Sequence, residues 1–378
     1  MSLLETLRRT VREKGPLPFA DYMQAALYSP HFGYYTADLP KLGKEGDFVT
    51  APEISTLFGK TLARQCADIL NELGNGAIFE FGAGSGALCV DILMALEHLD
   101  ALPEAYHILE ISPTLRARQE ARIRDEIPHL AGRVHWHLTL PEKPLKGIVL
   151  ANEVLDAMPV HRFLQTHEGL LESHVTLDEK DALKEIFLPC THERLQAHVQ
   201  KRLPPLTPPY LSEVNLHIDG WMQACHELLE RGVVIIIDYG FPRHEYYHPD
   251  RHTGTLMCHW RHQAHTNPLA HPGDEDITAH VDFTHVAEAA NNAGLTVAGF
   301  TSQAAFLVNA GLLDILQESP PDGNLATSMA VRQLLMPGEM GELFKVMALT
   351  RDYSMPLRGF HSFDKRASLN HETLSDNG

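Results

Sequence analysis

The sequence has little of what marks membrane, secreted or nucleic-acid-binding proteins. Its five cysteines are scattered and never spaced as C-x-x-C, so neither a disulfide framework nor a zinc knuckle is expected, and we interpret them as buried thiols. No run of about 18 apolar residues is present, so no membrane insertion is predicted. Lys and Arg number 31 against 49 Asp and Glu, and the formal charge of −18 argues against nucleic acid as a partner while it tolerates a cationic one.

The N-terminus shows no targeting signal. It reads MSLLETL and enters an amphipathic helical pattern at once. This start has neither the basic and apolar layout of a signal peptide nor the extended acid-free composition of a transit sequence. We therefore expect a cytoplasmic location, and a bacterial cytoplasm fits best.

The order of predicted elements favours an α/β fold. With 378 residues, one large domain with insertions or two packed lobes is expected. From Ala77 onward, strand, loop and helix alternate as in a parallel sheet. The predicted strands span 77–81, 105–111, 133–138, 147–151, 232–238, 295–300 and 343–350. The predicted helices span 2–13, 86–99, 113–126, 217–230, 284–293, 304–317 and 323–335, and short antiparallel strands are expected between 160 and 190.

These elements suggest a core with insertions. The expected parts are an N-terminal helical and loop region (1–70), a core (71–160 and 215–350), a lid-like insertion within that core (241–283), an inserted β-rich and helical segment (161–214) and a flexible tail (351–378). The insertion at 241–283 is rich in His and Pro, shows little periodicity and is far longer than an ordinary connection, which is typical of a functional loop.

A glycine-rich loop follows the first predicted strand of the core. The segment FEFGAGSGAL (79–88) contains Gly82, Ala83, Gly84, Ser85 and Gly86. Missing side chains let a ligand lie against the backbone and the N-terminus of the next helix, so the loop is predicted to hold a nucleotide-like cofactor. The dinucleotide pattern G-x-G-x-x-A also fits this segment, so the glycines alone leave two cofactors open.

Two carboxylates flank the loop. Glu80 precedes the first glycine by two residues and matches the acid-x-G-x-G-x-G form typical of methyltransferases, which favours S-adenosylmethionine over a dinucleotide. Glu110 closes the next strand, in HILEIS. It suits either cofactor, because both present ribose hydroxyls that a carboxylate can bind.

A second polar cluster follows the strand at 147–151. Asn152, Glu153 and Asp156 come at the carboxyl edge, where open α/β sheets bind ligands. This position predicts a chemical role. The alternative, in which Asn152 and Asp156 only cap the following helix, stays open.

Eight ordered blocks resemble the MidA-type proteins, whose mitochondrial members are complex I assembly factors acting as protein arginine methyltransferases. The blocks are GDFVTAPEIS (46–55), FGAGSGAL (81–88), LEISP (109–113), NEVLDAMPV (152–160), DYGF (238–241), GTLMCHWRHQAH (254–265), DITAHVDF (276–283) and PGEMGELFKVM (337–347). The resemblance implies a Rossmann-like class I methyltransferase fold with a mostly parallel seven-stranded sheet and an antiparallel last strand. It also implies S-adenosyl-L-methionine as cofactor and methyl transfer to an arginine of a protein, such as a subunit of respiratory complex I.

The residues are assigned to two roles. Those expected to bind the cofactor are Glu80, Gly82, Ala83, Gly84, Ser85, Gly86, Glu110, Ile111, Asn152 and Thr50. Because arginine stays protonated, with a pKa above about 12, carboxylates must hold its guanidinium and receive the departing proton. The catalytic candidates are Glu153, Asp156, Glu53, Asp282 and His280. For Asp282 and His280, an ordinary surface turn remains the alternative.

The histidines of the insertion do not indicate a metal site. His259, His262, His265 and His271 have none of the recognised ligand spacings, and no cysteine pair accompanies them. A loop that closes over cofactor or substrate is the preferred interpretation. Two other functions stay open, namely a non-catalytic assembly chaperone that keeps an S-adenosylmethionine pocket and an NAD-dependent oxidoreductase.

Overall fold

The computed structural model describes residues 2–37, 50–261, 263–318 and 325–370, and it divides into two compact units. Unit 1 comprises residues 1–48, 155–218 and 241–282, and unit 2 comprises residues 49–154, 219–240 and 283–378. Each unit is built from segments that are distant in the sequence. The chain therefore leaves unit 2 and returns to it twice.

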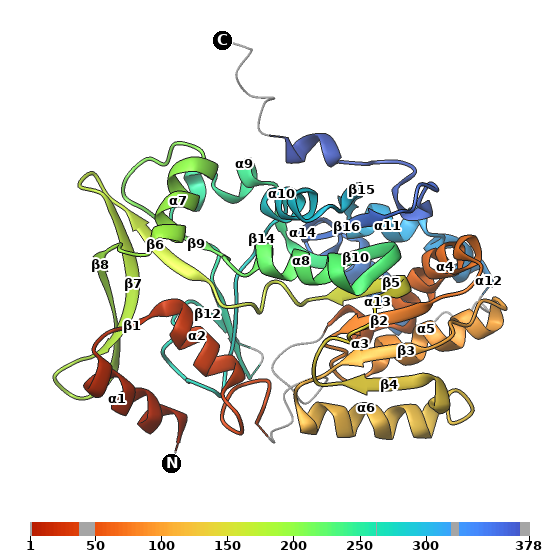
Figure 1. Cartoon of the computed structure of the whole chain (residues 1–378), viewed down its shortest axis with the longest axis horizontal. Helices are drawn as coiled ribbons and strands as arrows, with labels where there is room; N and C mark the ends of the chain where they lie inside the picture. The colour runs from red at the N-terminus through yellow and green to blue at the C-terminus, as the bar shows by residue number, and fades with distance from the viewer. Residues whose placement is uncertain (1, 38–49, 262, 319–324, 371–378) are drawn as a thin grey trace, which may run out of the picture. The chain divides into compact units, whose positions relative to one another are not determined.

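A central sheet organises unit 2 (Figure 1). Its main path runs β15, β16, β10, β5, β2, β3, β4, and β16 is antiparallel to both of its neighbours. The strands are β2 (Ala77–Phe81), β3 (Tyr106–Leu109), β4 (Val134–His137), β5 (Leu145–Asn152), β10 (Leu229–Phe241), β15 (Thr296–Ser302) and β16 (Phe344–Arg351). The predicted mostly parallel sheet of seven strands with an antiparallel last strand is confirmed.

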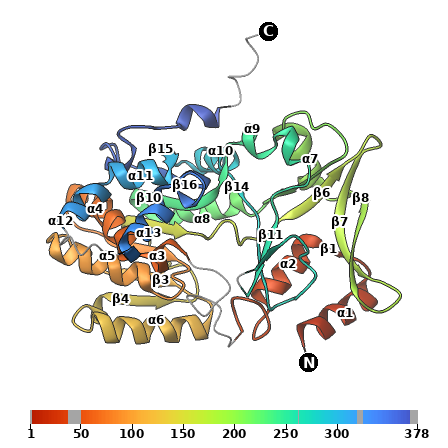
Figure 2. The same ribbon diagram turned by 180° about the vertical axis from the view of Figure 1, so that it is seen from behind.

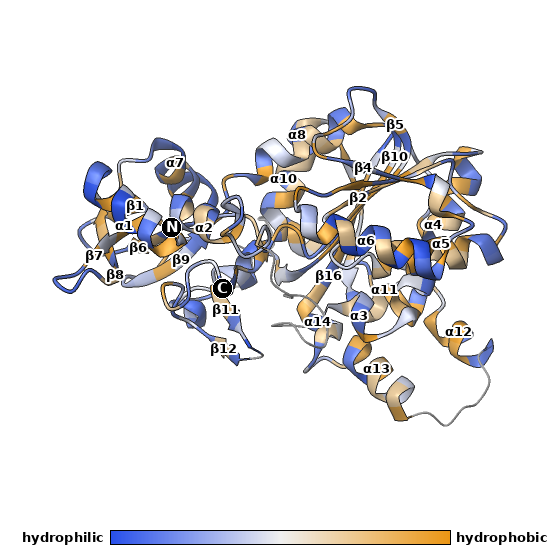
Figure 3. Cartoon of the chain, turned by 90° about the horizontal axis from the view of Figure 1, so that it is seen from below, coloured by the Kyte–Doolittle hydropathy of each residue, from blue (hydrophilic) through white to orange (hydrophobic). Residues whose placement is uncertain are grey.

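Burial on both faces explains why these segments form strands. All five residues of β2 are buried, and its hydrophobic colouring is visible in Figure 3. The run Val233 to Ile237 in β10 is likewise fully buried. Continuous apolar runs of this kind are typical of parallel strands that are covered by helices on both sides.

Several helices of unit 2 begin and end within two residues of the predicted positions, including α5 (Ala87–His98), α6 (Pro113–Glu126), α8 (Ile218–Leu228) and α10 (Phe283–Ala293). The other described helices of the unit are α3 (Ala51–Ile54), α4 (Thr56–Leu73), α11 (Gln303–Asn309), α12 (Leu312–Glu318), α13 (Leu325–Leu335) and α14 (Met340–Leu343). The single helix predicted over 304–317 is wrong. It is broken at Gly311, whose φ of 97° is incompatible with a continuing right-handed helix.

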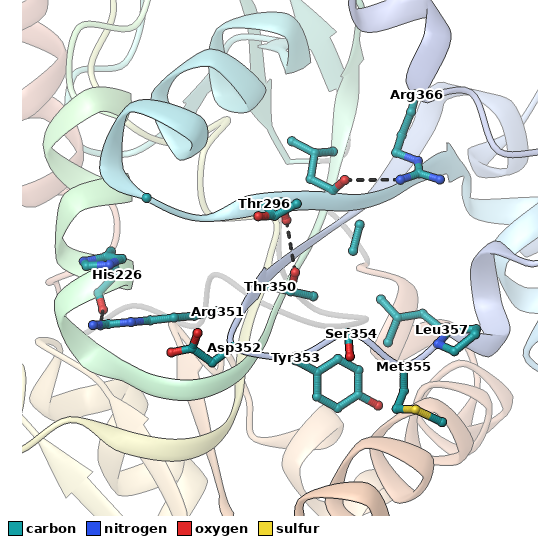
Figure 4. A pocket seen from close by; sticks show the side chains of 14 residues that line it. His226, Thr296, Thr350, Arg351, Asp352, Tyr353, Ser354, Met355, Leu357 and Arg366 are labelled. Atoms are coloured by element: carbon teal, nitrogen blue, oxygen red, sulfur yellow. Dashed lines mark hydrogen bonds between the residues drawn. The ribbon is translucent and has the colours of Figure 1, made fainter.

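The tail that was predicted to be flexible packs on unit 2 over residues 353–370. They include two 3₁₀ turns, Arg358–Phe360 and Arg366–Leu369, and they bury Leu357 and Phe360 in the core of unit 2. The segment also walls a cavity of about 930 Å³ at the end of β16, where Arg351 and Arg366 are among the lining residues (Figure 4). The prediction failed because isolated apolar residues without periodicity reveal nothing about what they pack against.

Unit 1 contains two small antiparallel sheets and two N-terminal helices. The larger sheet has the path β1, β7, β6, β9 with β8 beside β7, and the smaller has the order β12, β11, β13. The elements are α1 (Leu3–Lys14), β1 (Leu17–Pro18), α2 (Phe19–Tyr28), β6 (His161–Gln165), β7 (Leu170–Leu177), β8 (Leu183–Pro189), α7 (Glu193–Arg202), β9 (Tyr210–Val214), α9 (Arg243–Tyr246), β11 (Met257–Trp260), β12 (Gln263–His265), β13 (Asp276–Thr278) and β14 (Val281–Asp282).

The insertion at 241–283 is more ordered than its sequence suggests. Cys258 of β11 and Ile277 of β13 are fully buried and join the apolar cluster of α2, beside which β11 lies in Figure 2. The antiparallel strands predicted between 160 and 190 are confirmed as β6, β7 and β8. In the described part of the chain, no helix has the length and apolarity needed to cross a bilayer.

Candidate functional site

The glycine loop adopts a backbone that glycine favours. Gly82, Gly84 and Gly86 have φ values of 62°, 54° and 83°, all in the left-handed region. The N–H of Gly82 donates to Leu109 O at 3.1 Å, which ties the loop to the end of β3. Gly86 is the N-cap of α5. The loop therefore presents backbone and a helix N-terminus at the carboxyl end of β2, as a nucleotide-like ligand requires.

Asn152 and Glu153 lie at the switch point of the sheet. Strand β2 pairs with β3 on one side and with β5 on the other, and ligands of open α/β sheets bind where the strand order reverses. Val154 Cγ2 would lie 3.9 Å from a Cβ atom placed on Gly82, so this segment lies against the glycine loop. The cofactor loop and the part of the second polar cluster that belongs to unit 2, Asn152 and Glu153, are thus brought together.

Glu153 has a strained backbone. Its φ is 52°, a left-handed conformation that costs a residue with a Cβ about 1–2 kcal/mol. Its N–H donates to Ile237 O at 2.9 Å, and its Oε1 accepts a hydrogen bond from Asn152 Nδ2 at 3.3 Å. Strain of this kind persists where surrounding contacts enforce it, and it is common at functional sites.

Glu110 is held by donors on both oxygens. It is 5% exposed, and it accepts hydrogen bonds from Ser112 N at 2.8 Å and from Gln119 Nε2 at 2.9 Å. Burial raises the pKa of Glu110, and these hydrogen bonds lower it. Gln119 was not predicted from the sequence as a site residue, although the helical pattern contains a signal for its burial. It and Ile123, four residues later, are the two buried residues of the strongly charged helix α6.

Glu53 is engaged with the loop and with a cation. Ser85 Oγ donates to Glu53 Oε1, and Arg122 Nη1 lies 3.2 Å from the same oxygen. Arg122 also donates to Ser85 Oγ at 2.5 Å. Thr50 is the N-cap of the short helix that carries Glu53, and its carbonyl accepts from Glu53 N at 2.9 Å. Residues 46–49 of the matching block lie outside the described residues.

Glu80 lies in the core below the glycine loop. It is 2% exposed, and its Oε2 accepts a hydrogen bond from Tyr106 OH at 2.8 Å. Burial raises the pKa of Glu80 to about 7, while the bond from Tyr106 opposes that shift.

The raised pKa of Glu80 predicts a pH-dependent stability. The pKa of the Glu80 carboxyl is near 4.5 in the unfolded chain and about 7 in the folded protein. The contribution of this group to the free energy of unfolding is therefore full below pH 4.5 and is lost as the pH rises to about 7. The shift corresponds to at most about 3 kcal/mol. We expect Glu80→Gln to remove this part of the difference in unfolding free energy between pH 5 and pH 8, measured by urea denaturation. Glu230→Gln, at an exposed position of the same unit, is the control and should leave the difference unchanged.

Three catalytic candidates belong to unit 1. Asp282 Oδ2 accepts from Arg243 Nε at 3.0 Å, and this arginine is only 1% exposed. His280 stacks on Phe241 with ring centroids 5.3 Å apart. Asp156 is 4% exposed, and its carbonyl accepts from Ala279 N at 3.0 Å. Burial in these contacts is at odds with the alternative of an ordinary surface turn for Asp282.

The histidines of the insertion contact other partners. His265 Nε2 lies 3.1 Å from a carboxylate oxygen of Glu275, and His271 stacks on Trp260 at 3.9 Å between ring centroids. Among the residues that the structure describes, no group of three or more His, Cys, Asp or Glu side chains could hold a metal ion. His262 is not among them.

Comparison with known proteins gives concordant matches. Residues 61–301 match a family of S-adenosyl-L-methionine-dependent methyltransferases. The mitochondrial protein arginine methyltransferase NDUFAF7 homolog of Drosophila melanogaster is 30% identical over 92% of this chain and 84% of its own length. The mitochondrial protein arginine methyltransferase NDUFAF7 of Rattus norvegicus is 29% identical over the same shares.

Solved structures agree over nearly the whole chain. A Burkholderia thailandensis protein bound to S-adenosyl-homocysteine has a TM-score of 0.93 and 40% identity, with 97% of this chain and 96% of that chain covered. A native structure of a protein from the same organism has a TM-score of 0.90 and 41% identity, with the same coverage.

Proposed function

Because this chain belongs to the family of S-adenosylmethionine-dependent methyltransferases, we propose that the group it methylates is an arginine guanidinium of a protein partner. Two curated relatives are named as protein arginine methyltransferases, which supports this acceptor. The formal charge of −18 is compatible with a cationic substrate. From the resemblance to complex I assembly factors, a subunit of a respiratory complex is the partner to test first.

S-adenosylmethionine is the cofactor, and the NAD-dependent alternative is wrong. We propose that the glycine loop holds it, with Glu110 at the ribose hydroxyls and Asn152 at the neighbouring strand end. Ile111, which is 51% exposed beside Glu110, offers an apolar contact to the base. Thr50 and Glu80 are proposed to act indirectly, since Thr50 begins the helix of Glu53 and Glu80 lies under the loop.

The reaction needs alignment and one proton acceptor. The bound cofactor supplies a methyl group on a sulfonium. A guanidinium nitrogen forms the new C–N bond as the C–S bond breaks, and one proton leaves that nitrogen. Alignment of the two reactants accounts for much of the acceleration in such a displacement. We propose Glu153 as the carboxylate that orients the guanidinium and receives the proton, and the single observation that carries this role is its strained position at the switch point.

Two of the other candidates each form an ion pair with an arginine. Glu53 pairs with Arg122, and Asp282 pairs with Arg243. We therefore propose that both carboxylates position protein groups and leave the substrate guanidinium to others. Asp156 and His280 are proposed to contact the acceptor side of the substrate.

A labelled-methyl assay tests the proposal. Purified full-length protein, S-adenosylmethionine with a labelled methyl group and a lysate from a strain lacking this protein are combined, and the labelled protein is identified by mass spectrometry. Label on an arginine is expected. Label on another residue type would contradict the arginine acceptor, and capture of a partner without any added methyl would instead support the assembly chaperone.

Gly86→Ala tests the glycine loop. The φ of 83° disfavours alanine by about 1–2 kcal/mol, and a Cβ there would lie 3.3 Å from Gln119 Cα. We expect the affinity for S-adenosylhomocysteine, measured by calorimetry, to fall about tenfold, in line with a loss of about 1.4 kcal/mol. The matched control is Gly220→Ala in α8, where nothing lies within 4 Å of the added Cβ. Unchanged affinity in Gly86→Ala would contradict the assignment of the loop.

A further inference from the structure

A chain of three side chains connects β4, α6 and the end of β3. Trp136 Nε1 donates to Gln119 Oε1 at 2.9 Å. Gln119 Nε2 donates in turn to Glu110 Oε2 at 2.9 Å and to Gly84 O at 2.9 Å. Gln119 is 0% exposed, and its bond to Glu110 is buried, while Trp136 and Gly84 at the other two bonds are half-buried. One buried amide thereby contacts both the glycine loop and the carboxylate beside it.

Chemistry fixes the orientation of this amide. An indole N–H can only donate, so the atom of Gln119 that faces Trp136 must be the oxygen. The Gln119 NH₂ group then faces Gly84 O and the Glu110 carboxylate. A backbone carbonyl is always an acceptor, and a carboxylate is an acceptor only, with no donor, when it is ionised. In the reversed orientation the Gln119 NH₂ group would face the indole N–H, and the Gln119 oxygen would face Gly84 O and the Glu110 carboxylate, so none of these three hydrogen bonds could form.

The result is a Glu110 carboxylate with both oxygens anchored. Ser112 N donates to Oε1 at 2.8 Å and Gln119 donates to Oε2. The backbone N–H of Ile111 also donates to this carboxylate. A carboxylate has about four acceptor positions, so acceptor capacity remains for a ribose hydroxyl group. The neighbouring titratable group is Glu80 of β2, which is also buried. Donors that favour the charged form of Glu110 are needed here, because burial opposes that form.

We propose that Gln119 is a positioning residue that, oriented by Trp136, aims Glu110 at the ribose diol of S-adenosylmethionine and so makes binding selective for an intact ribose. This inference rests on the assignment of Glu110 to the ribose under the proposed function. Gln119 acts through Glu110 and through Gly84, and it need not contact the cofactor.

Calorimetry on the full-length protein tests the proposal. The ligands are S-adenosylhomocysteine and its 2′-deoxyribose analogue, and the variants are Gln119→Leu, Trp136→Phe and Glu110→Ala. A hydrogen bond to a charged group corresponds to about 10- to 100-fold in affinity. We expect the wild type to prefer the intact ribose at least about tenfold, and Gln119→Leu to lose most of this preference. Trp136→Phe keeps an aromatic ring in place and should lower the preference by a smaller factor.

Two further measurements separate positioning from simple structural support. In the double variant of Gln119→Leu and Glu110→Ala, the loss should be no greater than in Glu110→Ala alone, because the two residues act as one unit. The acid side of the pH profile of binding should move to higher pH in Gln119→Leu, because a donor that lowers the pKa of Glu110 is gone. Asp125→Asn, at an exposed position of the same helix, is the control and should match the wild type.

Each contrary outcome is distinguishable. Equal loss of affinity for both ligands in Gln119→Leu and in Trp136→Phe, with an unmoved pH profile, would overturn the proposal and leave a structural role. If Glu110→Ala itself kept the preference for the intact ribose, the assignment of Glu110 in the proposed function would be wrong, whatever the result for Gln119.

Discussion

Glu153→Gln is expected to reduce the rate of methyl transfer about 10²- to 10³-fold while the affinity for S-adenosylhomocysteine stays within about threefold, as for loss of a positioned acid–base or electrostatic group. Glutamine has nearly the shape of glutamate and can still accept a bond from Asn152, but it has no charge to hold a guanidinium and no affinity for the departing proton. The measurement is the rate of label transfer at saturating cofactor, with calorimetry for the cofactor itself.

The control needs a residue that has the same backbone strain as Glu153 but does not belong to the candidate site. Asp352 has a φ of 49°, close to the 52° of Glu153, and it follows β16 in the same unit. Asp352→Asn makes the same chemical change, from acid to amide, and should leave the transfer rate unchanged. Full activity in Glu153→Gln would mean that another group receives the proton. Equal losses in both variants would mean that the charge at Glu153 has no special role.

Phe360→Ala is expected to lower the free energy of unfolding by about 3–5 kcal/mol, which is the usual cost of removing a buried phenylalanine ring. Phe360 is 7% exposed, and its ring meets that of Phe306 edge-on with centroids 5.4 Å apart. It also covers Gly299, where an added Cβ would lie 2.3 Å from Phe360 Cγ. The ring therefore fills space that the sheet leaves open for it.

A nearby phenylalanine gives the matched control. Phe363 belongs to the same segment but is 73% exposed, so Phe363→Ala should change stability by less than about 0.5 kcal/mol. Urea denaturation followed by tryptophan fluorescence measures both variants. A small effect of Phe360→Ala would show that residues 353–370 do not stabilise unit 2, and would restore the expectation of a flexible tail.

Local patterns were sufficient for the parts of the fold with strong periodicity. The helix predicted over 113–126 begins and ends at the predicted residues, and β2 spans 77–81 as expected. Their signals are local, since a proline at the first helical turn and an unbroken apolar run require no knowledge of distant residues. The order of the strands could be anticipated only through the family resemblance, because pairing of β5 with β2 joins segments about 70 residues apart.

The partners of buried and half-buried charged side chains could not be predicted from the sequence. Arg243 reads as a surface residue in a polar stretch, yet it is almost fully buried against Asp282. Arg122 likewise reads as one of several charges on α6, yet it contacts Glu53 and Ser85, which are distant in the sequence. A side chain that forms a buried ion pair looks the same in the sequence as one in solvent, because its partner comes from another element.

For the glycine loop, the sequence by itself determined the position after a buried strand and the need for residues without side chains. It also placed Glu80 and Glu110 beside the loop, because both follow from strand and helix periodicity. Only the tertiary structure decided which groups each of these two carboxylates contacts. Glu80 lies in the core on Tyr106, while Glu110 is anchored by Gln119, whose amide is oriented by Trp136. Hydrogen bonds between separate elements set the direction and charge of a buried carboxylate, and those bonds exist only after the sheet and its helices have assembled.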